Sequence, residues 1–408
     1  MAFSLKKTLK RSYTARFVVW LLLLNWVDLL VVLLPIHRTV KSRKRVIFLK
    51  TDGLGDHIIW SATFVALEEL YPQDEFEKIL IATTKLVEIG RAEHLFEGHV
   101  FFNWERFVID PLYRFRAMRE MRRLDADILV NTRLTREFLW SDSIVRCSGA
   151  AERIGSRGID NQMTALQDQI ARSWYTKLAP APVRSDHELI SHKKFLDSLH
   201  PHKRNVLTLP KLGIVSALPV QAPRPDYAVF FLGASSPRRV FPIKRSVAVA
   251  EHVRGKYALE IILCGGPGEE KLGSAFRRDF SDKATDLIGK TSLGELAHIL
   301  AGAKLVVAND TGAAHFATAA KTPTVVLTPG SDVGRFFPYP EKPETREMRQ
   351  RSVLHEMPCF GCVWDCIYTD LADNEPWPCI GNIGVDDVLS TIEHLLGDSA
   401  MPERPADG

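Results

Sequence analysis

The stretch that decides the fold is VVANDTGAAH, residues 306–315. Its apolar start predicts a short buried strand, and the helix that we expect after it runs through Phe316 to Ala320. Asp310 or Thr311 can cap that helix. Free backbone N–H groups and the positive end of the helix dipole point at one spot where a helix follows a parallel strand. The turn therefore predicts an anion site.

Two side chains suggest that this turn does more than start a helix. Asp310 offers an acceptor for sugar or ribose hydroxyls, and His315 lies about one turn beyond Thr311 on the same helix face. An ordinary capped helix with a surface histidine would show the same local pattern. The rest of the chain has to distinguish the two interpretations.

A second unit of strand, glycine loop and helix lies near residue 50. The apolar run RVIFLK, residues 45–50, predicts a strand, and TDGLGD at 51–56 predicts a tight loop. His57 to Tyr71 is expected to form a helix that Pro72 ends. This order is typical of the first strand–helix turn of a Rossmann-like domain.

The loop itself carries candidate functional residues. Gly53 and Gly55 let the backbone approach a ligand closely, and Asp56 stands at the start of the following helix. The pattern G-x-G lacks the third glycine of the dinucleotide fingerprint, which argues against an NAD-dependent enzyme. A carboxylate at this position is also a common helix cap, so that interpretation stays open.

Composition and periodicity indicate a globular α/β protein of at least two domains. The chain has 408 residues, of which 46% are hydrophobic and 25% charged. Strands alternate with helices in both halves, which predicts parallel sheets. We expect strands near 45–50, 78–82, 99–102, 127–131, 227–232, 259–263, 304–308 and 324–327.

Together these motifs resemble glycosyltransferase family 9, the bacterial family of ADP-heptose:lipopolysaccharide heptosyltransferases. The resemblance covers roughly residues 45–395, and it begins with TDGLGDHII at 51–59 and ends with NDTGAAHFATAAKTPTVVL at 309–327. Three intermediate segments are also similar to family motifs, in the same order: FFLGASS followed by RVFP at 230–242, ILCGGPGE at 262–269 and LIGKTSL at 287–293.

The resemblance implies the GT-B architecture, in which two Rossmann-like domains face each other across a cleft. Pro210 to Pro225 is rich in proline and has little periodicity, which favours a linker there. We expect a basic and apolar membrane-associating segment at 1–44, an acceptor domain at 45–212, a linker at 213–226, a donor domain at 227–396 and a tail at 397–408.

The resemblance also assigns roles to residues. It implies a single displacement that inverts the anomeric carbon, with Asp56 as the catalytic base and Gly53 and Gly55 in its loop. It implies a donor, an ADP-sugar in preference, bound in the second domain. The donor-binding residues expected there are Ser235, Ser236, Arg239, Glu269, Lys290, Thr291, Asp310, Thr311, Gly312 and His315.

Some positions depart from the family pattern. Arg239 stands where the family usually has lysine, Phe241 replaces a tryptophan, and residues 328–332 replace the usual G-P-T-D-P. Arginine and lysine both neutralise phosphate, but only arginine offers a planar fork. The sequence therefore favours a nucleotide-sugar transferase, with a lipopolysaccharide or other cell-surface glycan as acceptor, more firmly than it favours heptose.

Two alternative functions remain. A sugar-nucleotide epimerase of the same architecture would bind a similar donor without an acceptor. A catalytically silent, membrane-associated binding protein would keep the fold without the reaction. Because no acidic pair resembles a D-x-D site, we expect that catalysis requires no metal or other cofactor.

The N-terminus carries a 20-residue apolar run, Phe17 to Ile36, that Asn25 and Asp28 interrupt. Up to Arg45 the chain has ten basic residues and one acid, a net charge of +9, although the whole chain carries only +4. The charge is thus a local patch without the interleaved aromatic residues of a nucleic-acid interface. We expect no nucleic-acid partner.

Three environments are open to this run. A spanning helix would place Asp28 near the bilayer centre at a cost of roughly 3 kcal/mol. An interfacial helix would turn Asn25 and Asp28 toward water, use Trp20 and Trp26 as anchors and bind anionic lipid. Packing against the protein itself is the third. The interfacial alternative places the protein at the cytoplasmic side of the bacterial inner membrane, as a peripheral or monotopic protein.

Four of the six cysteines lie close together in the sequence, at Cys359, Cys362, Cys366 and Cys379. Four thiolates can hold a structural zinc ion. The spacing fits an iron–sulfur cluster poorly, and a disulfide is disfavoured in the cytoplasm. Cysteines that only pack in a loop would show the same spacing.

Overall fold

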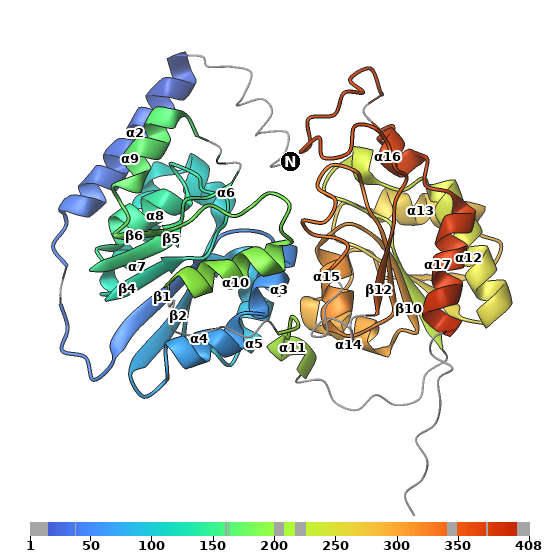
Figure 1. Cartoon of the computed structure of the whole chain (residues 1–408), viewed down its shortest axis with the longest axis horizontal. Coiled ribbons are helices and arrows are strands. Elements are labelled where there is room, and N and C mark those ends of the chain that lie inside the picture. Colours follow the sequence, from blue (N-terminus) through green and yellow to red (C-terminus); the bar gives the residue numbers. More distant parts are fainter. Residues whose placement is uncertain are drawn as a thin grey trace, which may run out of the picture. The chain divides into compact units, whose positions relative to one another are not determined.

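The computed structural model describes residues 15–36, 38–159, 161, 163–199, 208–216, 226–340, 349–372 and 374–397, with the backbone alone at 15–19. The chain divides into two compact units, Met1–Gly213 and Ile214–Gly408 (Figure 1). Of the expected linker, Gly213–Ser216 forms the short helix α11, and residues 217–225 lie outside the described residues, as does the tail from 398 on.

Unit 1 is a parallel sheet with helices on both faces. Its described strands are β1 (Lys44–Lys50), β2 (Phe76–Thr83), β3 (Gly98–Phe102), β4 (Ile128–Asn131), β5 (Glu152–Ser156) and β6 (Lys177–Ala179). Its described helices are α2 (Ala15–Leu33), α3 (Leu54–Ser61), α4 (Phe64–Leu70), η1 (Thr84–Leu86), α5 (Val87–Ala92), α6 (Trp104–Ile109), α7 (Pro111–Arg123), α8 (Ser141–Ser148), α9 (Ala165–Arg172) and α10 (Glu188–Leu199).

Unit 2 repeats this plan. Its described strands are β7 (Tyr227–Phe231), β8 (Glu260–Cys264), β9 (Ala284–Asp286), β10 (Leu305–Asn309), β11 (Thr324–Leu327) and β12 (Gln350–Val353). Its described helices are η2 (Pro237–Arg239), α12 (Ile243–Tyr257), α13 (Glu270–Asp279), α14 (Leu293–Gly302), α15 (Gly312–Ala319), α16 (Pro378–Gly381) and α17 (Val385–Gly397).

Both sheets have the same strand order. It is β3-β2-β1-β4-β5-β6 in unit 1 and β12-β11-β10-β7-β8-β9 in unit 2, and all the pairings are parallel. The order reverses between β1 and β4, and again between β7 and β10. In an open parallel sheet, ligands bind beyond the carboxyl ends of the strands at such a switch point. The topology thus marks one candidate site in each unit.

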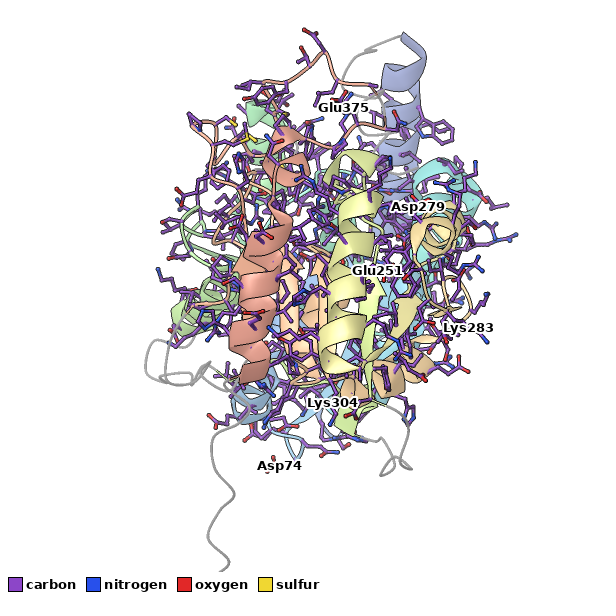
Figure 2. All side chains as sticks on the ribbon, turned by 90° about the vertical axis from the view of Figure 1, so that its right-hand side faces the viewer. Asp74, Glu251, Asp279, Lys283, Lys304 and Glu375 are labelled. Atoms are coloured by element: carbon purple, nitrogen blue, oxygen red, sulfur yellow. The ribbon has the colours of Figure 1, made fainter. Side chains whose placement is uncertain are left out.

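Successive side chains along the strands of unit 2 point to opposite faces of its sheet. Phe230, Leu263 and Val307 point to the core that α12, α13 and α17 close, whereas α14 and α15 cover the opposite face (Figure 1). Figure 2 looks onto α12 and α17, which lie side by side, and Glu251 marks the outer side of α12. Central strands buried on both faces are therefore almost wholly apolar.

Helix α2 packs against α7 and α8 of unit 1. Leu24, Val27 and Val31 are buried, and Val31 joins the core beneath α7 and α8. No described helix is long and apolar enough to cross a membrane. The expectation that Asn25 and Asp28 face water is wrong, because both side chains turn inward and bond to arginines of unit 1.

Candidate functional site

The unit 1 site is built at the ends of β1 and β4. Lys50 is the last residue of β1 and is fully buried, and its ammonium lies 3.2 Å from the Asp52 carboxylate. Arg133, just past β4, donates to the Thr51 hydroxyl over 3.3 Å. Two strands that are neighbours only in space thus place two cations beside the glycine loop.

Asp56 occupies the third position of α3, with Gly53 at the N-cap. Its Oδ2 accepts a hydrogen bond from the Gly53 amide at 3.0 Å. This bond fixes the carboxylate over the glycine loop while leaving it half-buried. The side chain is therefore held in one orientation with an oxygen free to accept a proton.

The surroundings shift the pKa values of Asp56 and Asp52 in opposite directions. Burial raises the pKa of Asp56, and the neighbouring Asp52 carboxylate raises it further. Burial acts against ionisation of Asp52 as well, but Lys50 and Arg133 together hold the pKa of Asp52 below its usual value. The pair therefore divides into an ionised Asp52 and an Asp56 with greater proton affinity, as a general base requires.

Sequence reasoning missed Asp52, Lys50 and His192 as part of this site. His192, on α10, is buried; desolvation above all, aided by the Lys50 charge, lowers its pKa to about 3, so it stays neutral. The Asp52 Oδ1 is buried and finds no partner among the described residues. The only sequence signal was a strand that ends in lysine, followed by a loop with aspartate at its second position.

In unit 2, Asn309 joins the ends of β7 and β10. Its side-chain amide donates to the carbonyls of Leu232 and Gly233, at 3.0 and 3.1 Å, and its Oδ1 accepts from the Phe241 amide at 3.1 Å. A buried polar group with all of its bonds satisfied fixes a local arrangement. Asn309 thereby holds the loop that carries Ser235 and Arg239 against the turn that carries Asp310.

Arg239 stands at the centre of this arrangement. Its guanidinium donates to the Ser235 hydroxyl at 2.9 Å and to the Asp310 carbonyl at 2.5 Å. It also lies over the Trp364 ring, 4.3 Å from the ring centroid. Such stacking is available to arginine in a way that it is not to lysine, which accounts for arginine at this position.

Asp310 is almost fully buried beside this cation. Its carboxylate lies 3.8 Å from the Arg239 guanidinium. Burial, with a smaller contribution from the Asp332 charge, nevertheless raises the pKa of Asp310 to about 6, although Arg239 lowers it. Asp310 is thus ionised at neutral pH and protonated in mild acid.

The start of α15 leaves its donors available. Thr311 is the N-cap, but within the described part of unit 2 its hydroxyl makes no capping hydrogen bond. Gly312 opens the helix and is half-exposed, as is Ser236 in the β7 loop. The expected side-chain cap is therefore not formed, and amides of the first turn remain free for an anion.

Glu269 lies against the ends of β7 and β8. Its carboxylate accepts from the Gly266 amide at 3.2 Å, and burial raises its pKa. A Cβ built on Gly233 would lie 2.0 Å from the Glu269 carboxyl carbon, and one built on Gly265 would lie 2.4 Å from its Oε2. Both positions are glycine because the carboxylate occupies the space of a side chain.

The other residues expected to bind the sugar donor are His315, Lys290 and Thr291. His315 is buried in an aromatic cluster, where it stacks on Phe337 at 4.2 Å and its Nδ1 lies 3.0 Å from the Tyr339 hydroxyl. It is therefore not a surface histidine. Lys290 is exposed and donates to the Asp286 carbonyl, and Thr291 follows it, half-buried, before α14.

The four clustered cysteines line one small cavity of about 10 Å³, about the volume that a single water needs. Among the described residues no group of three or more histidine, cysteine or acidic side chains is arranged to hold a metal ion. Burial raises the pKa of Cys362 and Cys379, with the neighbouring cysteines adding to it. The four thiols are gathered at one cavity, and the structural zinc ion expected there stays a prediction.

The cysteine loop also contacts the Arg239 site. The Gly361 and Val363 amides donate to the carbonyls of Gly330 and Ser331, and the Trp377 amide donates to the Arg238 carbonyl. These bonds place Trp364 under the Arg239 guanidinium.

Comparison with solved structures gives the same fold. A family 9 glycosyltransferase from Veillonella parvula matches with a TM-score of 0.68 at 16% identity, over 89% of this chain and 100% of that one. The E. coli heptosyltransferase WaaC with ADP gives 0.63 at 17% identity, over 86% and 99%. The iron-containing dodecameric glycosyltransferase TibC from enterotoxigenic E. coli gives 0.52 at 15% identity, over 89% and 78%.

No curated protein sequence matches the chain. The sequence model of glycosyltransferase family 9 (heptosyltransferase) matches residues 114–362, which is more than half of the chain. The two Rossmann-like units are those of the GT-B architecture. The chain belongs to glycosyltransferase family 9 and is a glycosyltransferase.

Proposed function

We propose that this protein transfers a heptose or related sugar from a nucleoside-diphosphate sugar, with ADP as the favoured nucleotide, to a lipopolysaccharide or other cell-surface glycan. We place the reaction at the cytoplasmic face of the bacterial inner membrane. The observation that carries the proposal is the meeting of Arg239, the start of α15 and Asp310 at the switch point of unit 2.

The donor half of the mechanism uses the charges of that site. Arg239 and the free amides at the start of α15 neutralise the diphosphate, and they stabilise the charge that grows on it as it leaves. Asp310 accepts hydrogen bonds from hydroxyls of the transferred sugar, and Glu269 accepts them from the ribose or a base edge. Support for ADP comes from WaaC, whose structure holds ADP.

The acceptor half uses Asp56. Its carboxylate takes the proton of the acceptor hydroxyl while the hydroxyl oxygen attacks the anomeric carbon. The bond from that carbon to the diphosphate oxygen breaks, and the nucleoside diphosphate leaves with the electron pair. A single displacement of this kind inverts the configuration of the anomeric carbon.

The proposal is tested by incubating the purified chain with an ADP-sugar and lipopolysaccharide that has a truncated core. Mass spectrometry should show the gain of one sugar, and NMR should show that its anomeric configuration is inverted. Retention of configuration would overturn the single displacement. If no nucleotide sugar gave any transfer, the catalytically silent binding protein would become the better explanation.

Replacement of Gly233 by alanine should raise the KM for the donor about tenfold, because the new Cβ would displace the Glu269 carboxylate and weaken about one hydrogen bond. Steady-state kinetics with varied donor measures this. The control is Gly255→Ala on α12, where a Cβ meets no atom within 4 Å. Equal donor KM values for wild type and Gly233→Ala would contradict the role of Glu269.

Donor binding should weaken in mild acid. Asp310 accepts from sugar hydroxyls only when ionised, and its pKa is raised to about 6 by burial. The donor KM is therefore expected to be constant above pH 6 and to rise about tenfold for each unit below it. Asp310→Asn should bind the donor weakly and lose this dependence; a KM of the wild type that is flat from pH 5 to 8 would exclude the role.

Transfer should need no divalent metal, because Arg239 and backbone amides supply the positive charge. We expect unchanged rates when a chelator replaces magnesium in the assay. A structural zinc ion at the four cysteines remains a prediction, and elemental analysis of the purified chain tests it. Loss of transfer in chelator that magnesium restores, with the melting temperature unchanged, would contradict metal-independent catalysis.

A further inference from the structure

Three polar side chains of helix α2 form hydrogen bonds with the rest of unit 1. Asp28 is fully buried, and both of its oxygens accept from the equally buried Arg114 of α7, at 2.7 and 2.8 Å. Asn25 accepts from Arg146 of α8 at 2.8 Å, and the Trp20 indole N–H donates to the Val108 carbonyl at 3.4 Å. The residues that interrupt the apolar run therefore fasten the helix to unit 1.

The C-terminal end of α2 is held in the same way. The Arg122 guanidinium of α7 donates to the carbonyls of Val32 and Leu34 and also to that of Cys147. A cation at this end satisfies carbonyls that the helix leaves unpaired and matches its dipole. The helix is thus a fixed part of the surface of unit 1.

Between Trp20 and Leu33, where the side chains of α2 are described, the exposed ones are all apolar. Five large side chains of this stretch are exposed by 42% to 77%: Leu22, Leu23, Trp26, Leu30 and Leu33. Ile109, the last residue of α6, and Leu112, in the first turn of α7, are both 58% exposed and follow Val108, whose carbonyl accepts from Trp20. Hereafter these seven residues are the α2 surface. A contiguous apolar patch of this kind on a soluble domain marks an interaction site.

The border of the α2 surface is cationic. Leu112, Arg119 and Arg123 recur at spacings of seven and four, so they share one exposed strip of α7. Arg122, which holds the end of α2, lies beside that strip. The one acid of α2, Asp28, is neutralised by Arg114 and so does not offset these charges.

We infer that the α2 surface docks the protein on an anionic lipid bilayer. The leucines and Trp26 enter the boundary between head groups and acyl chains, and the arginines of α7 meet lipid phosphates. A second copy of the chain would bring the same cationic border against itself, which disfavours self-association. The inference rests on the proposed function only in that a lipid-linked acceptor gives the docking a purpose.

The arrangement differs from that of an isolated amphipathic helix. Because Asp28 is paired inside the protein, no carboxylate of α2 has to enter the lipid, and binding requires no folding of the helix. The protein should therefore bind vesicles without a change in helix content. Its binding should also weaken as salt is added, since part of the attraction is between exposed charges.

The test is co-sedimentation of the full chain with vesicles of phosphatidylethanolamine and phosphatidylglycerol, compared with vesicles of phosphatidylcholine alone. We expect binding to the anionic vesicles. The double change Trp26→Glu with Leu30→Glu should lower the partition coefficient at least about tenfold. Arg119→Gln and Arg123→Gln should each lower it about fivefold. Val65→Glu, on the exposed side of α4, is the matched control and should bind as wild type does.

Each outcome decides the matter. Equal binding by wild type and the Trp26/Leu30 variant would overturn the inference, as would failure of the wild type to bind. A wild type that self-associates and ignores vesicles, with a monomeric variant, would make the α2 surface an interface between copies. Leu23→Gln with Leu33→Gln repeats the test if the first variant misfolds. Nucleotide-sugar binding, measured on the same samples, reports on the proposed function separately.

Discussion

Asp56→Asn is expected to lower kcat by about 10²–10⁴-fold while the donor KM changes little. The amide keeps the size of the side chain and can still accept from the Gly53 amide, so the loop should hold its shape. It cannot take a proton from the acceptor hydroxyl. Steady-state kinetics with saturating donor and acceptor measures the loss.

Asp110→Asn is the matched control, because that carboxylate accepts from the Tyr113 amide at the start of α7, away from the glycine loop. It should leave kcat unchanged. Asp52→Asn supplies a second readout: it removes the negative charge that raises the pKa of Asp56, so the acid limb of the kcat profile should move to lower pH. Full activity of Asp56→Asn would sink its assignment as the base.

Arg239→Ala is expected to reduce kcat/KM by about 10²–10³-fold, with the donor KM raised and kcat lowered. The guanidinium bonds both to Ser235, in the loop after β7, and to the Asp310 carbonyl, in the turn after β10. Its loss removes the cation that faces the diphosphate, both when the donor binds and when the nucleotide leaves. Kinetics with varied donor separates the two effects.

Arg239→Lys should fall between the wild type and Arg239→Ala, because it keeps the charge and loses the fork and the stacking on Trp364. Arg245→Ala on α12 is the control, since its guanidinium bonds only to the Ile383 carbonyl among the contacts of the described chain. Wild-type kcat/KM in Arg239→Ala would show that the diphosphate binds elsewhere.

The sequence predicted eight of the twelve described strands and missed β5, β6, β9 and β12. Central strands such as β1 and β10 are buried on both faces and appear as unbroken apolar runs. β6 and β9 have three residues each, of which only one is buried, and β5 and β12 each contain a single large apolar residue, Ile154 and Val353. Such segments carry too little apolar pattern to stand out from loops.

The helix expected from His57 to Tyr71 is two helices. α3 begins earlier, at Leu54, so that Asp56 lies inside its first turn, and the chain breaks between Ser61 and Phe64. Ser61 and Thr63 lie at this break, and their hydroxyls donate to the backbone carbonyls three residues earlier. Local side-chain bonds of this kind compete with the helix ladder, and periodicity alone does not show them.

The motif residues were predictable, and their neighbours were not. Asp56, Asp310 and Arg239 belong to local patterns, and so they could be found in the sequence. Arg133 and Asn309 act through contacts between strands distant in the chain. The predicted orientation of α2 was wrong for the same reason, because the partner of Asp28 is Arg114, 86 residues away.

The most direct test of the donor site is a calorimetric titration of the purified chain with ADP-, GDP- and UDP-sugars in the presence of chelator. We expect selective binding of one nucleotide, the ADP-sugar. For Arg239→Ala we expect a dissociation constant that is at least about tenfold higher. Absence of binding by folded wild-type protein, or equal binding by the variant, would contradict the assignment of unit 2 as the nucleotide-sugar site.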